Sequence, residues 1–317
     1  GNLGVLAGLG DIEATISTDV ELKRPLAVAF FSNEEGSRYP PDMMGSLAYA
    51  GGMSVEAVLE VEGADGTVVG EELERIGYRG AAPCPGVAPH AFVELHIEQG
   101  PVLDNEDIQI GVVEGVQGIS WTELTLIGQS NHAGTTPMSL RRDPMRVAAE
   151  VVVAARSIAT EMGGTQVATV GSLHLHPNLV NVVPATATMT VDLRNTDENS
   201  LQLAEEELHS RVEALAKDEG ITVEARSLAR FEPVEFDSRI VDQIEQLAQQ
   251  TGLSTKRMPS GAGHDAQMMA RICPTGMIFV PSLDGVSHNP AEHTDEADLI
   301  AGAQLLSDTM LALTEVD

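Results

Sequence analysis

The chain has 317 residues, a formal net charge of −30 and 43% hydrophobic residues. This length suits one or two globular domains, and no apolar run approaches the ~18 residues of a membrane-spanning helix, so we expect no membrane association. The chain has 48 acidic and 18 basic residues. We expect no binding to nucleic acid, because phosphate would be repelled over most of the surface.

The acidity is spread along the chain, and only three of the 18 basic residues are lysine, namely Lys23, Lys217 and Lys256. High salt screens the self-repulsion of such a chain, so the composition favours a halophilic protein over an ordinary acidic enzyme. The two cysteines, Cys84 and Cys273, cannot form a disulfide framework. Together with a start that has no secretory segment, this predicts a cytoplasmic protein.

Both ends of the chain alternate between helical and strand-like segments. Helical patterns lie at 3–17, 238–252 and 293–317, and continuous apolar runs lie at 25–32, 92–97 and 276–282. Continuous apolar runs are typical of strands buried on both faces, as in a parallel sheet. We therefore expect an α/β domain with a mainly parallel sheet, built from residues 1–114 and 230–317.

The middle of the chain has a different pattern. Alternating strands are predicted at 117–127, 166–176, 185–194 and 221–229, with helices at 143–162 and 198–219. The order is β-α-β-β-α-β, the split βαβ arrangement of ferredoxin-like domains. The alternation indicates that one sheet face is wet or meets a partner. We expect an inserted α+β domain over residues 115–229.

Polar side chains follow the ends of the three predicted apolar strands. They are Glu34 and Glu35, His96, and His288. The carboxyl ends of parallel strands meet at one edge of a sheet, which is where ligands bind. One carboxylate there could bind a metal while the other takes a proton from water, and oxygen with imidazole ligands suits zinc, manganese, cobalt or nickel. Taken alone, Glu34 and Glu35 are more typical of a solvated loop, and His96 is more typical of a packed side chain.

A further histidine of the α/β domain lies in the small-residue segment SGAGHDA, residues 260–266. His264 beside Asp265 could be an oriented imidazole, or the pair could open a helix with Asp265 as its cap. In the inserted domain, Arg194 ends a predicted strand. It could clamp a carboxylate with two hydrogen bonds, or simply pair with Asp192 in so acidic a chain.

Taken together, the motifs resemble the hydantoinase/carbamoylase family of amidohydrolases, within the di-metal aminoacylase and exopeptidase superfamily. The resemblance is carried, in this order, by FFSNEEGSRY, ELHIEQGPVL, NHAGTTPM, PNLVNVVP, DLR, GAGHDA and IFVPSLDGVSHNPAEHT. It implies a metal-dependent hydrolase that cleaves the carbamoyl (ureido) C–N bond of N-carbamoyl-L-amino acids or related ureido acids, releasing ammonia and carbon dioxide. It also implies a homodimer formed through the inserted domain, which serves as a lid.

The resemblance also implies roles for the strand-end residues. Glu34 matches the general base, Glu35 and His288 match ligands of one divalent metal, and His96 matches a ligand of a second. The family's HxD ligand motif and bridging aspartate would precede Gly1. A fragment or truncated protein is therefore expected, which would bind one metal or none where the complete enzyme binds two.

Four further residues match the substrate side of the family's site. Asn181 and Arg194 match residues that hold the substrate carboxylate, and His132 matches a lid histidine that stabilises the developing oxyanion, often from the other subunit. His264 falls in a substrate-side loop. Two alternatives stay open. One is a peptidase or N-acyl amino acid deacylase of the same superfamily, and the other is a catalytically inactive, truncated dimerising homologue.

Overall fold

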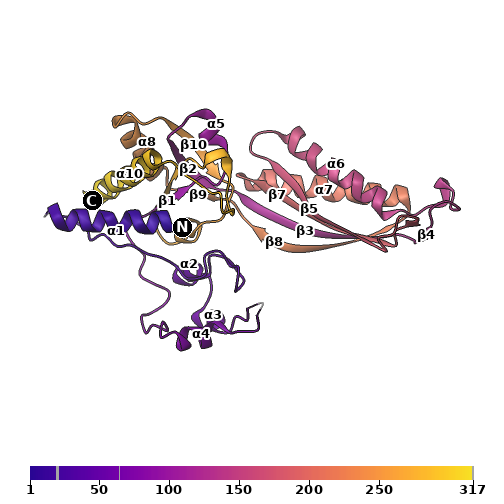
Figure 1. The fold of residues 1–317 in the computed structure, drawn as a ribbon, viewed down its shortest axis with the longest axis horizontal. Coiled ribbons are helices and arrows are strands. Elements are labelled where there is room, and N and C mark those ends of the chain that lie inside the picture. Colours follow the sequence, from indigo (N-terminus) through magenta and orange to yellow (C-terminus); the bar gives the residue numbers. More distant parts are fainter. Residues whose placement is uncertain (19–20, 64, 316–317) are drawn as a thin grey trace. The chain divides into compact units, whose positions relative to one another are not determined.

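The computed structural model describes residues 1–18, 21–63 and 65–315 (Figure 1). The chain divides into two compact units. Unit 1 comprises Gly1–Val116 and Glu235–Asp317, and unit 2 comprises Gln117–Val234. The inserted domain was expected over 115–229, and unit 2 is the segment of the structure that corresponds to it.

A mixed sheet forms the centre of unit 1. Its strands, in spatial order, are β1 (Phe92–Ile97), β11 (Thr275–Val280), β2 (Ile110–Val116) and β10 (Thr255–Ser260), and the two-residue strand β9 (Val234–Glu235) also pairs with β2. The β1–β11 and β2–β10 pairs are parallel, and the β11–β2 pair is antiparallel. Every residue of β11 is buried, as a continuous apolar run predicts for a central strand.

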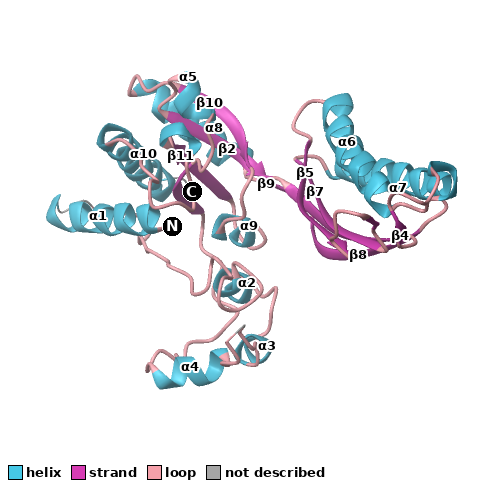
Figure 2. Cartoon of the chain, turned by 45° about the vertical axis from the view of Figure 1, so that its right-hand side comes forward, coloured by secondary structure: helices cyan, strands magenta, loops and turns pink. Residues whose placement is uncertain are grey.

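Helices and short turns make up the rest of the regular structure described in unit 1. They are α1 (Asn2–Thr18), α2 (Met44–Tyr49), α3 (Val55–Leu59), α4 (Val69–Arg75), α5 (Val102–Glu106), α8 (Ser238–Gln250), α9 (Asp265–Met269), the 3₁₀ turn η2 (Leu283–Gly285) and α10 (Glu296–Glu315). Helix α1 packs along α10 and against β1 (Figures 1 and 2). Helix α8 begins where the Asp237 carboxylate accepts a hydrogen bond from the Arg239 amide. None of the described helices combines the length and apolar character that crossing a membrane requires.

The strand predicted at 25–32 is wrong. Residues 25–31 have no regular secondary structure and, within the described parts of the chain, pair with no strand. The Phe30 side chain is 78% exposed. An apolar run expresses a preference for burial, but a strand also requires a neighbour that completes its hydrogen bonds.

Unit 2 is an antiparallel sheet covered on one face by two helices (Figure 2). The strand order is β5 (Val167–His176), β7 (Thr186–Asn195), β3 (Gly118–Ile127) and β8 (Thr222–Phe231). The remaining elements are the helices α6 (Pro144–Met162) and α7 (Glu198–Glu219), the 3₁₀ turn η1 (Met138–Leu140) and the two-stranded sheet of β4 (Asn131–His132) with β6 (Val182–Val183). The predicted β-α-β-β-α-β order is confirmed.

The core of unit 2 lies between its sheet and its helices. Strand β7 buries every second residue, including Met189 and Leu193, which pack in one cluster with Val151 of α6 and Leu201 of α7. Truncating a fully buried Met or Leu to Ala costs about 2–5 kcal/mol, so this face determines the register of β7. The other side chains of β7, including Arg194, lie on the opposite, partly exposed face.

Candidate metal and active site

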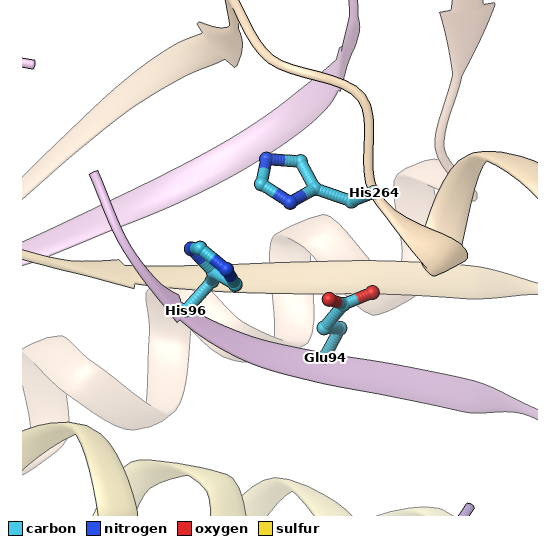
Figure 3. Close-up of side chains that lie close together, drawn as sticks. All are labelled: Glu94, His96 and His264. Atoms are coloured by element: carbon cyan, nitrogen blue, oxygen red, sulfur yellow. The ribbon is translucent and has the colours of Figure 1, made fainter. Parts of the chain in front are cut away.

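Three side chains of unit 1 lie close enough together to hold one metal ion (Figure 3). Glu94, His96 and His264 each place a ligand atom within 4.8 Å of those of the other two. Glu94 and His96 are two residues apart on β1, so the alternation of a strand puts both on one face. His264 immediately precedes α9, and its ring centroid lies 4.6 Å from that of His96. Two imidazoles and a carboxylate form a donor set that suits zinc and similar ions.

Burial keeps both imidazoles in the form that binds metal. It lowers the pKa of His96 to about 4 and also lowers the pKa of His264, which is 1% exposed. His96 Nδ1 lies 2.8 Å from the Ile97 carbonyl oxygen, so Nδ1 is the protonated nitrogen and Nε2 keeps its lone pair. Neutral imidazoles oriented through the second ring nitrogen are the usual protein ligands of divalent metals.

Ser260 orients His264. The sequence had suggested Asp265 for this role. The Ser260 hydroxyl donates to the Ala262 carbonyl at 2.9 Å, and its oxygen lies 2.8 Å from His264 Nε2. Because that hydroxyl hydrogen is already used, His264 Nε2–H is the donor to Ser260. This leaves the lone pair of His264 Nδ1 available to a metal.

Carboxyl groups gather beside the histidines. Burial and the charge of Asp265 raise the pKa of Glu94, whose Oε2 accepts a hydrogen bond from the Ala266 amide at 2.8 Å. Burial also raises the pKa of Asp265, whose carboxylate lies 2.5 Å from the Ser46 hydroxyl. Burial and Asp265 together raise the pKa of Glu34 to about 7. Buried carboxylates are costly unless a cation compensates them, so this cluster favours a bound metal ion.

The segment carrying Glu34 and Glu35 is held by hydrogen bonds to the residues that follow it. The Asn33 side chain donates to the Tyr39 carbonyl at 2.6 Å, and the Glu34 carbonyl accepts from the Met43 amide at 2.7 Å. Both contacts fold the chain back on itself directly after residues 25–32. This turn brings the two adjacent glutamates to the site in the absence of a preceding strand.

Glu35 and His288 form an exposed pair. Glu35 Oε2 lies 3.8 Å from His288 Nε2, and the two side chains are 68% and 72% exposed. The backbone of His288 has φ of 53°, and its amide donates to Glu292, which also accepts from the Ser287 hydroxyl. The Glu292 carboxylate therefore shapes the turn that presents His288.

One cavity of about 990 Å³ in unit 1 is lined by most of these groups, but the buried His264 is not part of its lining. Its lining includes the four residues predicted from strand ends, Glu34, Glu35, His96 and His288. It also includes Glu94 and Asp265, which the sequence had not marked as site residues. The period-two spacing of Glu94 and His96 in the segment ELHI could have identified Glu94.

Unit 2 separates the substrate-side residues predicted within it. The amide of Ala133, the residue after His132, donates to the Asn181 carbonyl at 2.9 Å. His132 and Asn181 are therefore close to each other. Arg194 lies near the other end of β7, eight residues beyond Thr186. At ~3.3 Å per residue this is about 26 Å. His132 pairs with Val182, which precedes the Thr186 end of β7, so Arg194 does not meet His132 within one copy of unit 2.

The Arg194 side chain is held on the partly exposed sheet face. Its Nε and Nη2 donate to the Asp192 carboxylate at 3.1 and 2.9 Å, so the pairing with Asp192 that the sequence left open is present. The guanidinium carbon also lies 5.9 Å from the centroid of the Trp121 ring. Trp121 and Asp192 are paired across β3 and β7, which explains why both reach the same guanidinium.

Known proteins resemble this chain over almost its entire length. Residues 2–312 match Peptidase family M20/M25/M40. The chain is 38% identical to an N-carbamoyl-L-amino acid amidohydrolase of Geobacillus stearothermophilus, over 99% of this chain and 78% of that protein. It is 37% identical to an allantoate amidohydrolase of Escherichia coli, over 90% of this chain and 70% of that protein.

A solved structure agrees with these relatives. The crystal structure of a hydantoinase/carbamoylase family amidase from Burkholderia multivorans superimposes with a TM-score of 0.96 at 40% identity, covering 99% of this chain and 76% of that one. The family resemblance drawn from the seven motifs, and the α/β fold class that it implied, are confirmed.

Proposed function

Since the chain belongs to Peptidase family M20/M25/M40, we propose that it is an amidohydrolase of ureido acids. It cleaves the carbamoyl C–N bond of N-carbamoyl-L-amino acids, or of related acids such as allantoate, and releases ammonia and carbon dioxide. The observation that carries the proposal is the Glu94–His96–His264 donor set, of which Glu94 and His96 line one cavity together with Glu34, a carboxyl whose pKa burial raises to about 7.

The residues present fit divalent metal ions. Glu94, His96 and His264 would hold one ion, and Glu35 with His288 would contribute to a second, as expected for a complete enzyme with two metals. Zinc, manganese, cobalt and nickel all suit this donor set. When bound, such ions polarise a carbonyl and lower the pKa of water.

Glu34 is the proposed general base. A catalytic base works best when its pKa lies near the operating pH, and burial raises that of Glu34 to about 7. Its carboxylate takes the proton of the water that attacks the ureido carbon and returns a proton to the leaving nitrogen. The Asp265 charge contributes to the raised pKa, so Asp265 supports Glu34 as a base.

Unit 2 provides the proposed substrate contacts. The planar guanidinium of Arg194, held by Asp192, would donate two parallel hydrogen bonds to the substrate carboxylate. Asn181 would assist in holding that carboxylate, and His132 would stabilise the oxyanion. A small ureido acid cannot bridge the roughly 26 Å of β7 that lie between Arg194 and Thr186, the end of the strand that follows the Val182 partner of His132. A homodimer, in which His132 and Asn181 of one copy complete the site of the other, resolves this separation.

Composition supports the proposed setting of the protein. Cys84 is exposed and Cys273 is buried, and both are free thiols, which suits a reducing cytoplasm. The chain has 48 acidic and only 18 basic residues, which suits a halophilic cell, because salt screens the repulsion between the acidic side chains.

A substrate panel tests the proposed function. The chain is assayed in molar KCl with zinc, manganese, cobalt or nickel against N-carbamoyl-L-methionine, allantoate, N-acetyl-L-methionine and a dipeptide. We expect ammonia release from a ureido acid and at least tenfold lower kcat/KM for the acetyl compound and the peptide, roughly the discrimination of one polar contact. Preferred cleavage of the acetyl compound or the peptide would favour the deacylase or peptidase alternative, and no turnover of any compound would favour the inactive homologue.

A further inference from the structure

Hydrogen bonds within the loop that carries His132, residues 131–137, hold its conformation. Strand β4 pairs with β6, with His132 opposite Val182. Thr136 closes the turn, because its amide and its hydroxyl both donate to the His132 carbonyl, at 3.2 and 2.8 Å. Most of the loop is exposed, so burial contributes little to its conformation.

A single side chain from outside the loop, that of Arg141, forms hydrogen bonds to two of its carbonyls. Arg141 Nε donates to the Thr136 carbonyl at 3.1 Å, and Arg141 Nη2 donates to the Ala133 carbonyl at 2.6 Å. One planar guanidinium therefore fixes both sides of the turn after His132. Among the described residues Arg141 forms no ion pair with a carboxylate, although acidic residues outnumber basic ones 48 to 18. Hydrogen bonds from a charged donor are about twice as strong as neutral ones, so this contact is a substantial constraint.

The loop also determines which nitrogen of His132 carries hydrogen. The Gly134 amide donates to His132 Nδ1 at 3.1 Å. An amide can only donate, so Nδ1 is the acceptor and the neutral ring carries its hydrogen on Nε2. His132 thereby offers an N–H donor without needing a positive charge, which is what a developing oxyanion requires.

We propose that Arg141 is a positioning residue for His132. By holding the Ala133 and Thr136 carbonyls, Arg141 keeps the Gly134 amide on His132 Nδ1 and keeps the Nε2–H donor directed outward. The kinetic part of this inference rests on the proposed function, because it assigns His132 to the oxyanion. The structural part, a ring with one tautomer and one orientation, does not.

The kinetic test compares two adjacent arginines. Arg141→Gln removes the contact, and Arg142→Gln removes the same charge from the exposed neighbouring side chain. We expect kcat of Arg141→Gln to fall at least tenfold with KM within about twofold of the original, and Arg142→Gln to keep its kcat. His132→Ala should lose about 100-fold or more, and adding Arg141→Gln to it should cause no further loss. Equal losses in both arginine variants, or additive losses in the double variant, would overturn the proposal.

The structural test needs no activity. In ¹⁵N-labelled protein, the His132 ring, assigned by its disappearance in His132→Ala, should show an unprotonated Nδ1 and a protonated Nε2 at pH 8. Arg141→Gln should shift these signals toward the averaged values of a free imidazole, and Arg142→Gln should not. Arg141→Lys, which keeps one charged donor, should lie between. If the ureido acids are not hydrolysed, the proposed function fails, but the spectrum still tests the role of Arg141. Identical His132 signals in Arg141→Gln, Arg141→Lys and the original protein would reject the proposal that Arg141 positions His132.

Discussion

The rings of His96 and His264 lie 4.6 Å apart between centroids, with their planes inclined by 59°. One comes from the end of a sheet strand and the other from the residue before a short helix. Because burial lowers the pKa of both, they stay uncharged at neutral pH and do not repel each other. Two adjacent neutral imidazoles beside Glu94 make the metal site the first feature to test.

Removing one imidazole should weaken metal binding. We expect His96→Ala or His264→Ala to lower the affinity for zinc or manganese more than tenfold, since loss of even an outer contact typically costs 10- to 100-fold. Titration calorimetry and elemental analysis after dialysis measure this. His209→Ala, which removes a 67% exposed histidine on α7, is the control. Equal metal content in all variants would refute the assignment.

Replacing Glu34 by Gln should abolish most turnover. The amide keeps the size of the side chain but cannot accept a proton, so kcat should fall about 10²- to 10⁴-fold. The midpoint of thermal unfolding should not fall, because burial disfavours the charged Glu34 carboxylate. Glu60→Gln, at an exposed site after α3, is the control. A Glu34→Gln enzyme with full kcat would show that another group is the base.

Truncating Arg194 should act on substrate binding. We expect Arg194→Ala to raise KM for ureido acids about 10- to 100-fold, the value of hydrogen bonds to a charged group, and Arg194→Lys to recover only part of this. Ureido compounds without a carboxylate should be unaffected. Arg226→Ala, which removes a 69% exposed guanidinium paired with Glu123, is the matched control. If neutral and anionic compounds lose equally, Arg194 does not bind the carboxylate.

Asp11 should make stability depend on pH. Burial against α10 and the nearby Asp308 charge raise the pKa of Asp11 from 3.8 to about 6. The folded state therefore holds this proton more tightly than the unfolded state, so the contribution of Asp11 to stability is present below pH 4 and is lost as the pH rises through 6.

The Asp11→Asn variant tests this sign. It should be more stable than the original protein by about 1–2 kcal/mol at pH 8, allowing for solvent screening of a half-buried group, and nearly equal to it at pH 4. Denaturant unfolding at the two pH values measures the difference. Glu13→Gln, on the exposed side of α1, should show no such change. A variant that is less stable at pH 8 would contradict the prediction.

Salt should stabilise the fold. With a net charge of −30, raising KCl from 0.1 M to about 3 M should increase the thermal unfolding midpoint by more than about 10 °C, because counterions screen the repulsion. Sucrose controls for general exclusion of solutes from the surface. A midpoint that does not change with KCl would end the halophilic interpretation.

Local patterns in the sequence determined the long helices and strands of unit 2, whereas strands β2 and β10 of unit 1 were not predicted. The alternating segments at 117–127 and 185–194 became β3 (Gly118–Ile127) and β7 (Thr186–Asn195), and the helical segment at 143–162 became α6 (Pro144–Met162). Each of these elements carries its own periodicity, because its side chains alternate between a core and solvent. The motifs likewise pointed to the family, since they are read along the chain.

Only the tertiary structure decided which side chains meet. The apolar run at 25–32 is no strand, Glu94 joins His96 and His264, and Ser260 rather than Asp265 orients His264. Arg194 and His132, both predicted substrate contacts, lie in two different sheets of unit 2, on β7 and on β4. Residue spacing reports the geometry of one element, whereas a strand partner, a buried cluster or the distance across a sheet depends on segments remote in the chain that only packing brings together.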